Sequence, residues 1–177
     1  MQKGVTVWFT GLSGSGKTTI NRLVETQLRK TGIRVEVLDG DDIRKWLAAD
    51  LGFSKEDRRK NIERAAFVAK LLTRNDVLVL ASFISPFREM REYCRKEIGS
   101  FVEVFVNCPL EVCVQRDVKG LYKKAIAGQI EHFTGISDPY EAPESPEVTV
   151  YTDRETAEES TGKVIGYLQS MRYIPPA

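Results

Sequence analysis

The sequence carries its most specific chemistry near the N-terminus, where small residues precede a lysine and a threonine. Residues 11–18 read Gly-Leu-Ser-Gly-Ser-Gly-Lys-Thr and match the pattern G-x-x-x-x-G-K-[ST] in full. Glycine allows backbone conformations in which successive N–H groups turn toward a phosphate, and a helix starting at Lys17 adds its dipole. The Lys17 ammonium is expected to reach the β- and γ-phosphates, and the Thr18 hydroxyl to reach Mg²⁺. The predicted phosphate loop consists of Gly11, Leu12, Ser13, Gly14, Ser15, Gly16, Lys17, Thr18 and Thr19.

Motifs that the chain lacks narrow the choice of nucleotide. A dinucleotide-binding turn requires G-x-G-x-x-G, but Thr19 stands where the third glycine belongs after Gly14 and Gly16. Proteins that read guanine carry Asn-Lys-x-Asp, and no such tetrapeptide occurs. The apolar run at 77–82 ends without the aspartate that most mechanical ATPases place there to hold the metal. We therefore expect ATP as the nucleotide, with the metal-holding acid supplied from elsewhere.

Two carboxylates follow the second predicted strand, in the sequence Asp39-Gly40-Asp41. Ligands of open α/β folds bind at the carboxyl ends of the strands, which is where this turn belongs. Asp39 is expected to act on Mg²⁺ through its water ligands, and Asp41 to accept the proton of an acceptor hydroxyl as general base. The alternative is a plain Asp-Gly turn in which Asp41 or Asp42 caps the next helix.

Basic and amide side chains after this turn indicate an anionic acceptor. Arg44 follows the turn closely, and Arg58 and Asn61 share one face of the next long helix at spacing i and i+3. Arginine offers a planar fork suited to phosphate or sulfate, and asparagine supplies both a donor and an acceptor for a sugar or a base. The alternative is that these residues are ordinary solvent-exposed helix positions, as we expect for Arg59 and Lys60.

The elements that must position these residues follow from hydrophobic patterning. Short β-branched runs alternate with longer segments of helical period, which is typical of a parallel sheet with helices on both faces. The predicted strands are 5–10, 34–38, 77–82, 102–106 and 148–151, and the predicted helices are 17–30, 42–49, 55–74, 86–97, 110–116 and 155–170. Ser54 and Asp57 form a capping box at the start of the third helix. The fold class is therefore α/β, a doubly wound, mainly parallel five-stranded sheet of the P-loop NTPase type.

Between the last two predicted strands the helical period fails. The segment 120–146 accumulates Gly128, Gly135, Pro139, Pro143 and Pro146. This pattern predicts a long functional loop or lid with little regular structure, approximately at residues 117–146. No internal repeat or break in composition suggests a second unit, so we expect a single domain over residues 1–177.

Composition excludes several classes of protein. Lys and Arg number 26 against 25 Asp and Glu, so the formal net charge of +1 gives no overall field toward nucleic acid or an anionic membrane. The longest strongly apolar stretch, residues 77–81, is far shorter than the ~20 residues of a membrane span. Three cysteines without CxxC spacing argue against a disulfide scaffold and a structural zinc site. We expect a cytoplasmic protein with no nucleic-acid or membrane partner.

Taken together, these motifs resemble the adenylylsulfate kinase family over nearly the whole chain. The resemblance is carried by the phosphate loop, Leu-Asp-Gly-Asp at 38–41, Leu-Gly-Phe-Ser-Lys-Glu-Asp-Arg at 51–58, Phe-Ile-Ser-Pro at 83–86, Arg-Asp-Val-Lys-Gly-Leu-Tyr-Lys-Lys-Ala at 116–125, Phe-Thr-Gly-Ile at 133–136 and Asp-Pro-Tyr-Glu-Ala-Pro at 138–143. It implies transfer of the ATP γ-phosphoryl group to the 3′-hydroxyl of adenosine 5′-phosphosulfate (APS). The products would be 3′-phosphoadenosine 5′-phosphosulfate and ADP, in sulfate activation, and the protein would be a homodimer.

The resemblance also implies roles for individual residues. The acceptor nucleotide would be held by Asp41, Arg44, Arg58 and Asn61, with Phe53 and Phe133 on either side of its adenine, Ile84 and Ser85 lining the pocket, and Lys119 and Leu121 covering it. Arg116 would stack on the adenine of ATP, and Lys119 with Lys123 would neutralise phosphate charge when the lid closes. From the residues alone, Phe53 and Phe133 are predicted to be core residues.

Ser85 matches a serine that is treated as a phosphoserine intermediate in some members of the family. Transfer in line between two bound nucleotides needs only positioning and charge stabilisation, and Ser85 has no neighbouring histidine to activate it. We therefore expect Ser85 to line the pocket or to cap a helix that begins at Pro86, rather than to form an obligatory intermediate.

Two rival functions remain open at this stage. The first is another small-metabolite P-loop kinase, acting on AMP, shikimate or gluconate. The second is a nucleotide-gated binding module that keeps the ATP site without turnover. The acceptor dependence of ADP formation distinguishes the three.

Overall fold

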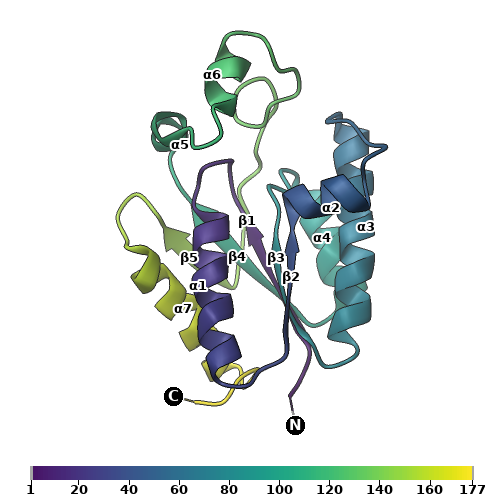
Figure 1. Ribbon diagram of the computed structural model, residues 1–177, viewed down its shortest axis with the longest axis vertical. Helices are drawn as coiled ribbons and strands as arrows, with labels where there is room; N and C mark the ends of the chain where they lie inside the picture. The colour runs from purple at the N-terminus through teal and green to yellow at the C-terminus, as the bar shows by residue number, and fades with distance from the viewer. Residues whose placement is uncertain (1, 177) are drawn as a thin grey trace.

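The computed structural model describes residues 2–176 and is built around a parallel sheet (Figure 1). The strands are β1 (Val5–Thr10), β2 (Val35–Asp39), β3 (Leu78–Ser82), β4 (Phe101–Asn107) and β5 (Val148–Tyr151). They lie in the order β2-β3-β1-β4-β5, and all of these neighbours pair in parallel. The prediction of a doubly wound, parallel, five-stranded α/β fold is confirmed.

Helices cover both faces of the sheet. They are α1 (Lys17–Lys30), α2 (Gly40–Trp46), α3 (Lys55–Thr73), α4 (Arg88–Ile98), α5 (Leu110–Arg116), α6 (Leu121–Ile126) and α7 (Ala157–Ser170). Helices α1 and α7 pack side by side on one face, and α3 and α4 pack side by side on the other (Figure 1). In the same view α5 and α6 lie above the sheet, on the side of the phosphate loop.

The two core layers follow from the period of two along each strand. In β1, Val5, Val7 and Phe9 pack into the layer under α1 and α7, whereas Trp8 packs into the layer under α3 and α4. Every residue of β1 is buried, as expected for a central strand covered on both faces. The phosphate loop therefore follows directly on a central, fully buried strand.

The boundaries of α3 and α4 show where local sequence signals hold and where they fail. The Ser54 hydroxyl accepts a hydrogen bond from the Asp57 N–H at 3.1 Å, so Ser54 caps α3 as predicted. The Asp57 carboxylate accepts from the Ser54 hydroxyl at 2.8 Å and not from the Ser54 N–H, so the reciprocal half of the predicted capping box does not form. Helix α4 begins at Arg88 and not at residue 86, because Phe87 keeps an extended backbone. Ser85 itself has a φ of 40°. The prediction that Ser85 caps a helix starting at Pro86 is therefore wrong.

The lid, residues 117–146, contains more regular structure than the sequence indicates. Helix α6 lies within it, and the Asp117 carboxylate accepts hydrogen bonds from the N–H groups of Tyr122 and Lys123 at 2.9 and 3.1 Å. Tyr122 and Ala125 are buried on one side of this short helix. The prediction of little regular structure fails for these residues, because one and a half turns are too short to show a helical period.

The three cysteines, Cys94, Cys108 and Cys113, are all buried and form no disulfide bond. Within residues 2–176, no three or more His, Cys, Asp or Glu side chains are grouped so as to hold a metal ion. Over the same residues, none of the helices has the length and apolar content needed to cross a membrane.

Candidate active site

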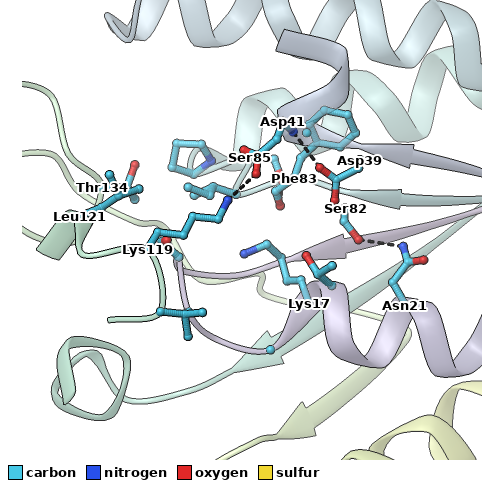
Figure 2. A pocket seen from close by; sticks show the side chains of 18 of the residues that line it. Lys17, Asn21, Asp39, Asp41, Ser82, Phe83, Ser85, Lys119, Leu121 and Thr134 are labelled. Carbon is cyan, nitrogen blue, oxygen red and sulfur yellow. Dashed lines mark hydrogen bonds and ion pairs between the residues drawn. The ribbon is translucent and has the colours of Figure 1, made fainter. Parts of the chain in front are cut away.

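A cleft of about 1330 Å³ opens where β1, β2 and β3 end. Its walls come from the phosphate loop, α2, α3, the segment after β3 and the lid (Figure 2). The predicted site residues that line it are Ser13, Gly14, Gly16, Lys17, Thr18, Thr19, Asp39, Asp41, Arg44, Phe53, Arg58, Asn61, Ile84, Ser85, Arg116, Lys119, Leu121 and Phe133. Four other predicted residues, Gly11, Leu12, Ser15 and Lys123, are not part of the lining. Since pockets for a single drug-sized ligand have volumes of roughly 300–1,000 Å³, this cleft is larger than one such ligand requires.

The phosphate loop has the backbone geometry of an anion site. Gly14 and Gly16 have φ values of 73° and 105°, in the left-handed region that favours glycine. Gly11 runs so close to β4 that a Cβ atom there would lie 2.5 Å from the carbonyl oxygen of Val106. Helix α1 begins at this loop without a side-chain cap or an acidic residue in its first turn. Its first N–H groups therefore remain available to an anion.

The Lys17 ammonium lies inside this loop. Its Nζ donates hydrogen bonds to the carbonyl oxygens of Gly11 and Leu12, at 2.9 and 2.7 Å. Burial lowers the pKa of Lys17 to about 8, although the carboxylates of Asp39 and Asp41 oppose this shift. The loop thus holds a poorly solvated cation, which the negative charge of a polyphosphate would stabilise.

The Asp-Gly-Asp turn places its two carboxylates differently. Asp39 ends β2, and its Oδ1 accepts a hydrogen bond from the Asp41 N–H at 2.9 Å, which caps α2. The cap is therefore Asp39, and not Asp41 or Asp42 as the alternative reading of the turn required. Gly40 fits tightly, since a Cβ there would lie 3.0 Å from the carbonyl oxygen of Ser82. The Asp41 side chain is 77% exposed and forms an ion pair with Lys119 of the lid (Figure 2).

The oxygens near Lys17 suit a magnesium ion bound together with a nucleotide. Thr18 exposes its hydroxyl on the first turn of α1, and the second oxygen of Asp39 has no hydrogen bond to any residue between 2 and 176. Mg²⁺ prefers oxygen ligands and keeps several waters, so it is often held by one or two protein groups plus phosphates. The donor set therefore fits Mg²⁺ on a nucleotide better than a free metal ion.

Two arginines fix the loop that carries Phe53. The guanidinium carbons of Arg44 and Arg58 lie 4.2 and 5.6 Å from the centre of the Phe53 ring, which is 52% exposed. Arg44 Nη1 donates to the Gly52 carbonyl at 2.7 Å, and Arg58 Nε donates to the Phe53 carbonyl at 3.0 Å. Burial lowers the pKa of both arginines. The Phe53 ring thus lines the cleft, and Arg44 and Arg58 hold the backbone that carries it. The prediction, from the residues alone, that Phe53 is a core residue is wrong.

Arg58 also reaches the lid. Its Nη2 donates to the His132 carbonyl at 2.5 Å, next to Phe133. Phe133 packs edge to face against Tyr122, with ring centres 5.0 Å apart, and the Tyr122 hydroxyl donates to the Ser13 carbonyl at 2.8 Å. Arg58 is only 8% exposed, so it is not the solvent-exposed helix residue that the alternative required. One buried guanidinium therefore holds the backbone beside both phenylalanines.

Three buried polar atoms in the cleft wall have no hydrogen-bond partner among the described residues. They are Asn21 Oδ1 on α1, Asn61 Oδ1 on α3 and Thr134 Oγ1 on the lid. Buried polar groups are normally paired, so three unpaired atoms in one cleft indicate that their partners come from a bound ligand or from water.

The segment after β3 forms the floor of the cleft. Trp8 Nε1 donates to the Ser85 hydroxyl at 3.1 Å, and this hydroxyl donates to Thr10 Oγ1 at 3.0 Å. Thr10 Oγ1 in turn donates to the Ile84 carbonyl at 2.8 Å. No histidine or carboxylate contacts the Ser85 hydroxyl among the described residues, so nothing there would remove its proton.

Arg116 connects Thr152 with Gly14 at the phosphate-loop end of the cleft. Its Nη2 donates to the Thr152 carbonyl at 2.6 Å, and its Nη1 contacts the Thr152 hydroxyl at 3.2 Å and the Gly14 carbonyl at 3.4 Å. Thr152 Oγ1 also donates to the Ser15 carbonyl at 2.7 Å. Arg116 therefore lies beside the phosphate loop, at the end of the cleft opposite Phe53.

Several residues of the site were not predicted from the sequence. Tyr122 and Thr134 line the cleft from the lid. Tyr140, near the end of the lid, does not line the cleft, but its hydroxyl lies 3.0 Å from Thr10 Oγ1. For Tyr122 a signal existed, because Tyr122 and Ala125 have helical spacing after a glycine. For the other two no local pattern reveals a contact that depends on the folded lid.

Comparison with known proteins places this geometry in a family. The model of the adenylylsulphate kinase family matches residues 3–151. The chain is 62% identical over 173 residues to the adenylyl-sulfate kinase of Halothermothrix orenii, an alignment that covers 98% of this chain and 94% of that protein. Its fold matches the APS kinase of Mycobacterium tuberculosis, solved in complex with AMPPNP and APS, with a TM-score of 0.92 and 47% identity, covering 96% and 99% of the two chains.

A more distant likeness shows the fold alone. A gluconokinase from Sinorhizobium meliloti aligns with a TM-score of 0.59 over 97% of this chain and 95% of its own, at only 14% identity. This likeness extends only to the fold, whereas the match at 62% identity covers 98% of the chain, including α2, α3 and the lid. By sequence and by structure, the chain belongs to the adenylylsulphate kinase family.

Proposed function

We propose that the protein is an ATP-dependent adenylylsulfate kinase that phosphorylates the ribose 3′-hydroxyl of APS. The observation that carries this proposal is the single cleft, which joins an anion-binding loop around Lys17 to a pocket bordered by Phe53, Phe133 and Arg58. The first part suits a triphosphate, and the second suits an anionic nucleotide with a flat base. One cleft that holds both ligands brings their reacting groups together.

The proposed reaction is a direct, in-line phosphoryl transfer. The acceptor 3′-oxygen forms a bond to the γ-phosphorus of ATP as the bond between that phosphorus and the β–γ bridging oxygen breaks, and ADP leaves. Asp41 accepts the proton of the 3′-hydroxyl as general base. Lys17 and the N–H groups of the phosphate loop stabilise the charge that develops on the transferring group and on ADP.

Mg²⁺ is the proposed cofactor. Thr18 would hold it directly, and Asp39 would hold it through water. When bound it would supply positive charge that offsets the negative charge of the nucleotide phosphates. The unpaired oxygen of Asp39 and the exposed Thr18 hydroxyl support this placement.

The acceptor pocket is proposed to select an adenine nucleotide by stacking and by charge. Phe53 and Phe133 would enclose the base, where stacking contributes roughly 1–3 kcal/mol per base in comparable single-strand binders. Arg44 and Arg58 would supply positive charge near the phosphosulfate, and Asn61 a polar partner for the nucleoside. The orphaned Asn61 oxygen supports this role. Ile84 and Leu121 would complete the walls.

At the other end of the cleft, Arg116 is proposed to stack on the adenine of ATP. Lys119 and Lys123 would come close to the phosphates when the lid closes; Lys119 already lines the cleft, whereas Lys123 would need the lid to move. Ser85 is proposed to line the pocket without forming a covalent intermediate, because Trp8 and Thr10 occupy its hydroxyl and no base contacts it among the described residues.

Three broader properties belong to the same proposal. The chain acts as a single domain with a lid at 117–146, it works in the cytoplasm, where ATP is available, and two copies form a dimer. Exposed apolar side chains on α2 and α3, Trp46, Leu47 and Phe67, support self-association. Light scattering on the purified protein measures the mass of the assembly, and a Phe67→Glu variant that keeps the wild-type mass would remove this face as the contact.

The reaction is tested by the acceptor dependence of ADP release with Mg²⁺ and ATP. APS, AMP, shikimate and gluconate are supplied in turn. We expect turnover with APS alone. Turnover with gluconate or shikimate would assign another small kinase, and ATP-dependent thermal stabilisation without any turnover would assign a binding module.

A further inference from the structure

The last part of the lid runs along the surface of α4. We call residues 139–147 the returning arm, since they end the lid and lead into β5. Three arginines on one face of α4 hold this arm, at spacing i, i+3 and i+7. Arg88 Nε donates to the Ala142 carbonyl at 2.9 Å, and Arg95 forms a two-pronged ion pair with Glu147 at 2.6 and 2.8 Å. The arm is therefore the anchored side of the lid.

The middle arginine makes contacts of a different kind. Arg91 is only 3% exposed, and each of its nitrogens donates to a separate part of the molecule. Nε donates to Glu103 Oε1 on β4 at 2.8 Å, Nη1 to the Ser85 carbonyl at 2.5 Å, and Nη2 to the Glu141 carbonyl at 2.6 Å. Arg91 thus connects the core, the floor of the acceptor pocket and the returning arm.

The hydrogen bond from Arg91 to the Ser85 carbonyl bears on the backbone conformation of Ser85. Ser85 has a φ of 40°, a left-handed conformation that is unfavourable for a residue with a Cβ atom and persists only where its surroundings hold it. The Trp8 indole N–H fixes the hydroxyl of Ser85, and Arg91 fixes its carbonyl. This conformation also directs the Ile84 carbonyl onto Thr10, so the shape of the pocket floor depends on both anchors.

Two residues of the returning arm, Tyr140 and Glu141, also bond directly to residues at the pocket floor. The Tyr140 hydroxyl bonds Thr10 Oγ1 at 3.0 Å, and the Glu141 N–H donates to the Pro86 carbonyl at 2.8 Å. The Arg91 guanidinium lies over the Tyr140 ring, 5.7 Å from its centre. A shift of the returning arm would therefore move the Ile84–Pro86 segment, with Arg91 as the rigid link between them.

We infer that Arg91 is a positioning residue for the acceptor: it holds Ser85 in its left-handed conformation and couples the pocket floor to the returning arm of the lid. The inference rests on the proposed function, in which Ile84 and Ser85 line the APS pocket. Arg91 itself does not line the cleft, so it acts only through the segment it holds. If Arg91 served only to form an ion pair with Glu103, it would not need its hydrogen bonds to the carbonyls of Ser85 and Glu141.

The test compares Arg91→Lys with Arg88→Ala. Lysine keeps a positive charge beside Glu103 but loses the fork that reaches both carbonyls. Arg88 lies on the same helix face and binds the same arm, but it makes no contact with Ser85, so Arg88→Ala is the matched control. Because replacement of a buried charge can unfold a protein, the double variant Arg91→Met/Glu103→Met removes both charges together as a second test.

The first readout needs no substrate. The chain has two tryptophans, Trp8 and the 74% exposed Trp46, so an NMR spectrum of the substrate-free protein shows two indole N–H signals. We expect the Trp8 signal to shift in Arg91→Lys and in the double variant, and to keep its position in Arg88→Ala. The Trp46 signal serves as an internal reference, since a general change of the protein would move both.

The second readout separates acceptor from nucleotide. A hydrogen bond from a charged group is worth about 1.5–3 kcal/mol, so losing the Ser85 contact should raise the KM for APS about tenfold or more. The KM for ATP should stay within about twofold, because Arg91 touches no part of the phosphate loop. Equal rises in both KM values, or an unmoved Trp8 signal in both variants, would overturn the inference. If wild-type protein does not turn over APS, the proposed function fails, while the Trp8 signal still decides whether Arg91 holds Ser85.

Discussion

Lys119 of the lid and Asp41 of α2 form an ion pair across the mouth of the cleft, although they lie 78 residues apart in sequence. Both side chains are more than half exposed. An exposed pair of this kind contributes about 0–1 kcal/mol, so it opens easily when a ligand competes for either partner. In the proposed reaction, this pair would hold Asp41 toward the cleft before the acceptor arrives and keep Lys119 beside the cleft until the phosphates bind.

Replacement of Lys119 by Met should affect turnover more than stability. The melting temperature should change by about 2 °C or less, since the pair is exposed. The kcat should fall about 10–100-fold, because a cation near the transferring phosphoryl group is lost. Calorimetry and the rate of ADP release measure the two quantities. Lys124→Met, on the adjoining lid helix α6 but outside the cleft lining, is the control, and an unchanged kcat in Lys119→Met would remove Lys119 from the mechanism.

Exchanging the two carboxylates for amides should separate their roles. Asp41→Asn is expected to lower kcat about 10²–10⁴-fold with little change in APS affinity, because an amide cannot accept the proton. Asp39→Asn is expected to raise the Mg²⁺ concentration needed for half-maximal rate. Binding is measured by titration calorimetry and turnover by ADP release. The opposite pattern, in which Asp39→Asn alone abolishes turnover with APS affinity retained, would exchange the two assignments.

Removing the Lys17 charge should stabilise the protein when no nucleotide is bound. Burial lowers the pKa of Lys17 from its ordinary value of 10.5 to about 8, so below pH 8 the folded protein keeps a charged group that is better solvated in the unfolded chain. Lys17→Met should therefore gain about 1–3 kcal/mol at pH 7, or roughly 2–12 °C in melting temperature.

The sign of this effect can be checked by changing pH. Between pH 8 and pH 10.5 the folded state releases its proton first, so wild-type stability rises toward that of Lys17→Met as pH increases. Melting curves at pH 7 and pH 9.5 measure the difference, and Lys30→Met, at the exposed end of α1, should show none. A Lys17→Met variant that melts below wild type at pH 7 would contradict the prediction.

Arg58→Ala should damage acceptor binding, whereas its neighbour Arg59→Ala should not. Arg58 is buried and holds the carbonyls of Phe53 and His132, while Arg59 is exposed and pairs with Glu56 and Glu63 on the surface of α3. The KM for APS should rise about 10–100-fold in Arg58→Ala, with the KM for ATP little changed. Steady-state kinetics with each substrate varied in turn measures both values. Similar values for the two variants would show that the clamp on both phenylalanines is unimportant.

Much of the fold was predictable because fully buried strands and capped helices have strong local signals. The strands at 5–10 and 148–151 and the helices at 17–30 and 110–116 have the predicted bounds. Local signals fail where the cause is distant. The φ of 40° at Ser85 depends on Trp8 and on Arg91, and no feature of the sequence next to Ser85 indicates it.

In the candidate site, too, some features follow from the local sequence and others depend on residues far apart in the chain. The phosphate loop is recognisable from eight consecutive residues, because its function depends on local backbone conformation. The contacts of Arg58 with His132 and of Tyr122 with Ser13 join residues 74 and 109 positions apart, and they exist only once the lid has folded over α3 and the phosphate loop. From the sequence these contacts could be expected only through a resemblance, and not from spacing.

The position of the lid between β4 and β5 also bears on how the molecule folds. The phosphate loop needs only β1, the adjoining helix and close neighbours, but the pairing of β4 with β5 must bridge the whole segment from Asn107 to Val148. Closing such a loop loses entropy that grows slowly with length, by about 0.6 kcal/mol for each doubling. We therefore expect β5 to join the sheet late, so that the nucleotide end of the cleft forms before the acceptor end is covered. For the same reason, residues inserted at the tip of the lid should slow this last step only slightly and leave the sheet intact.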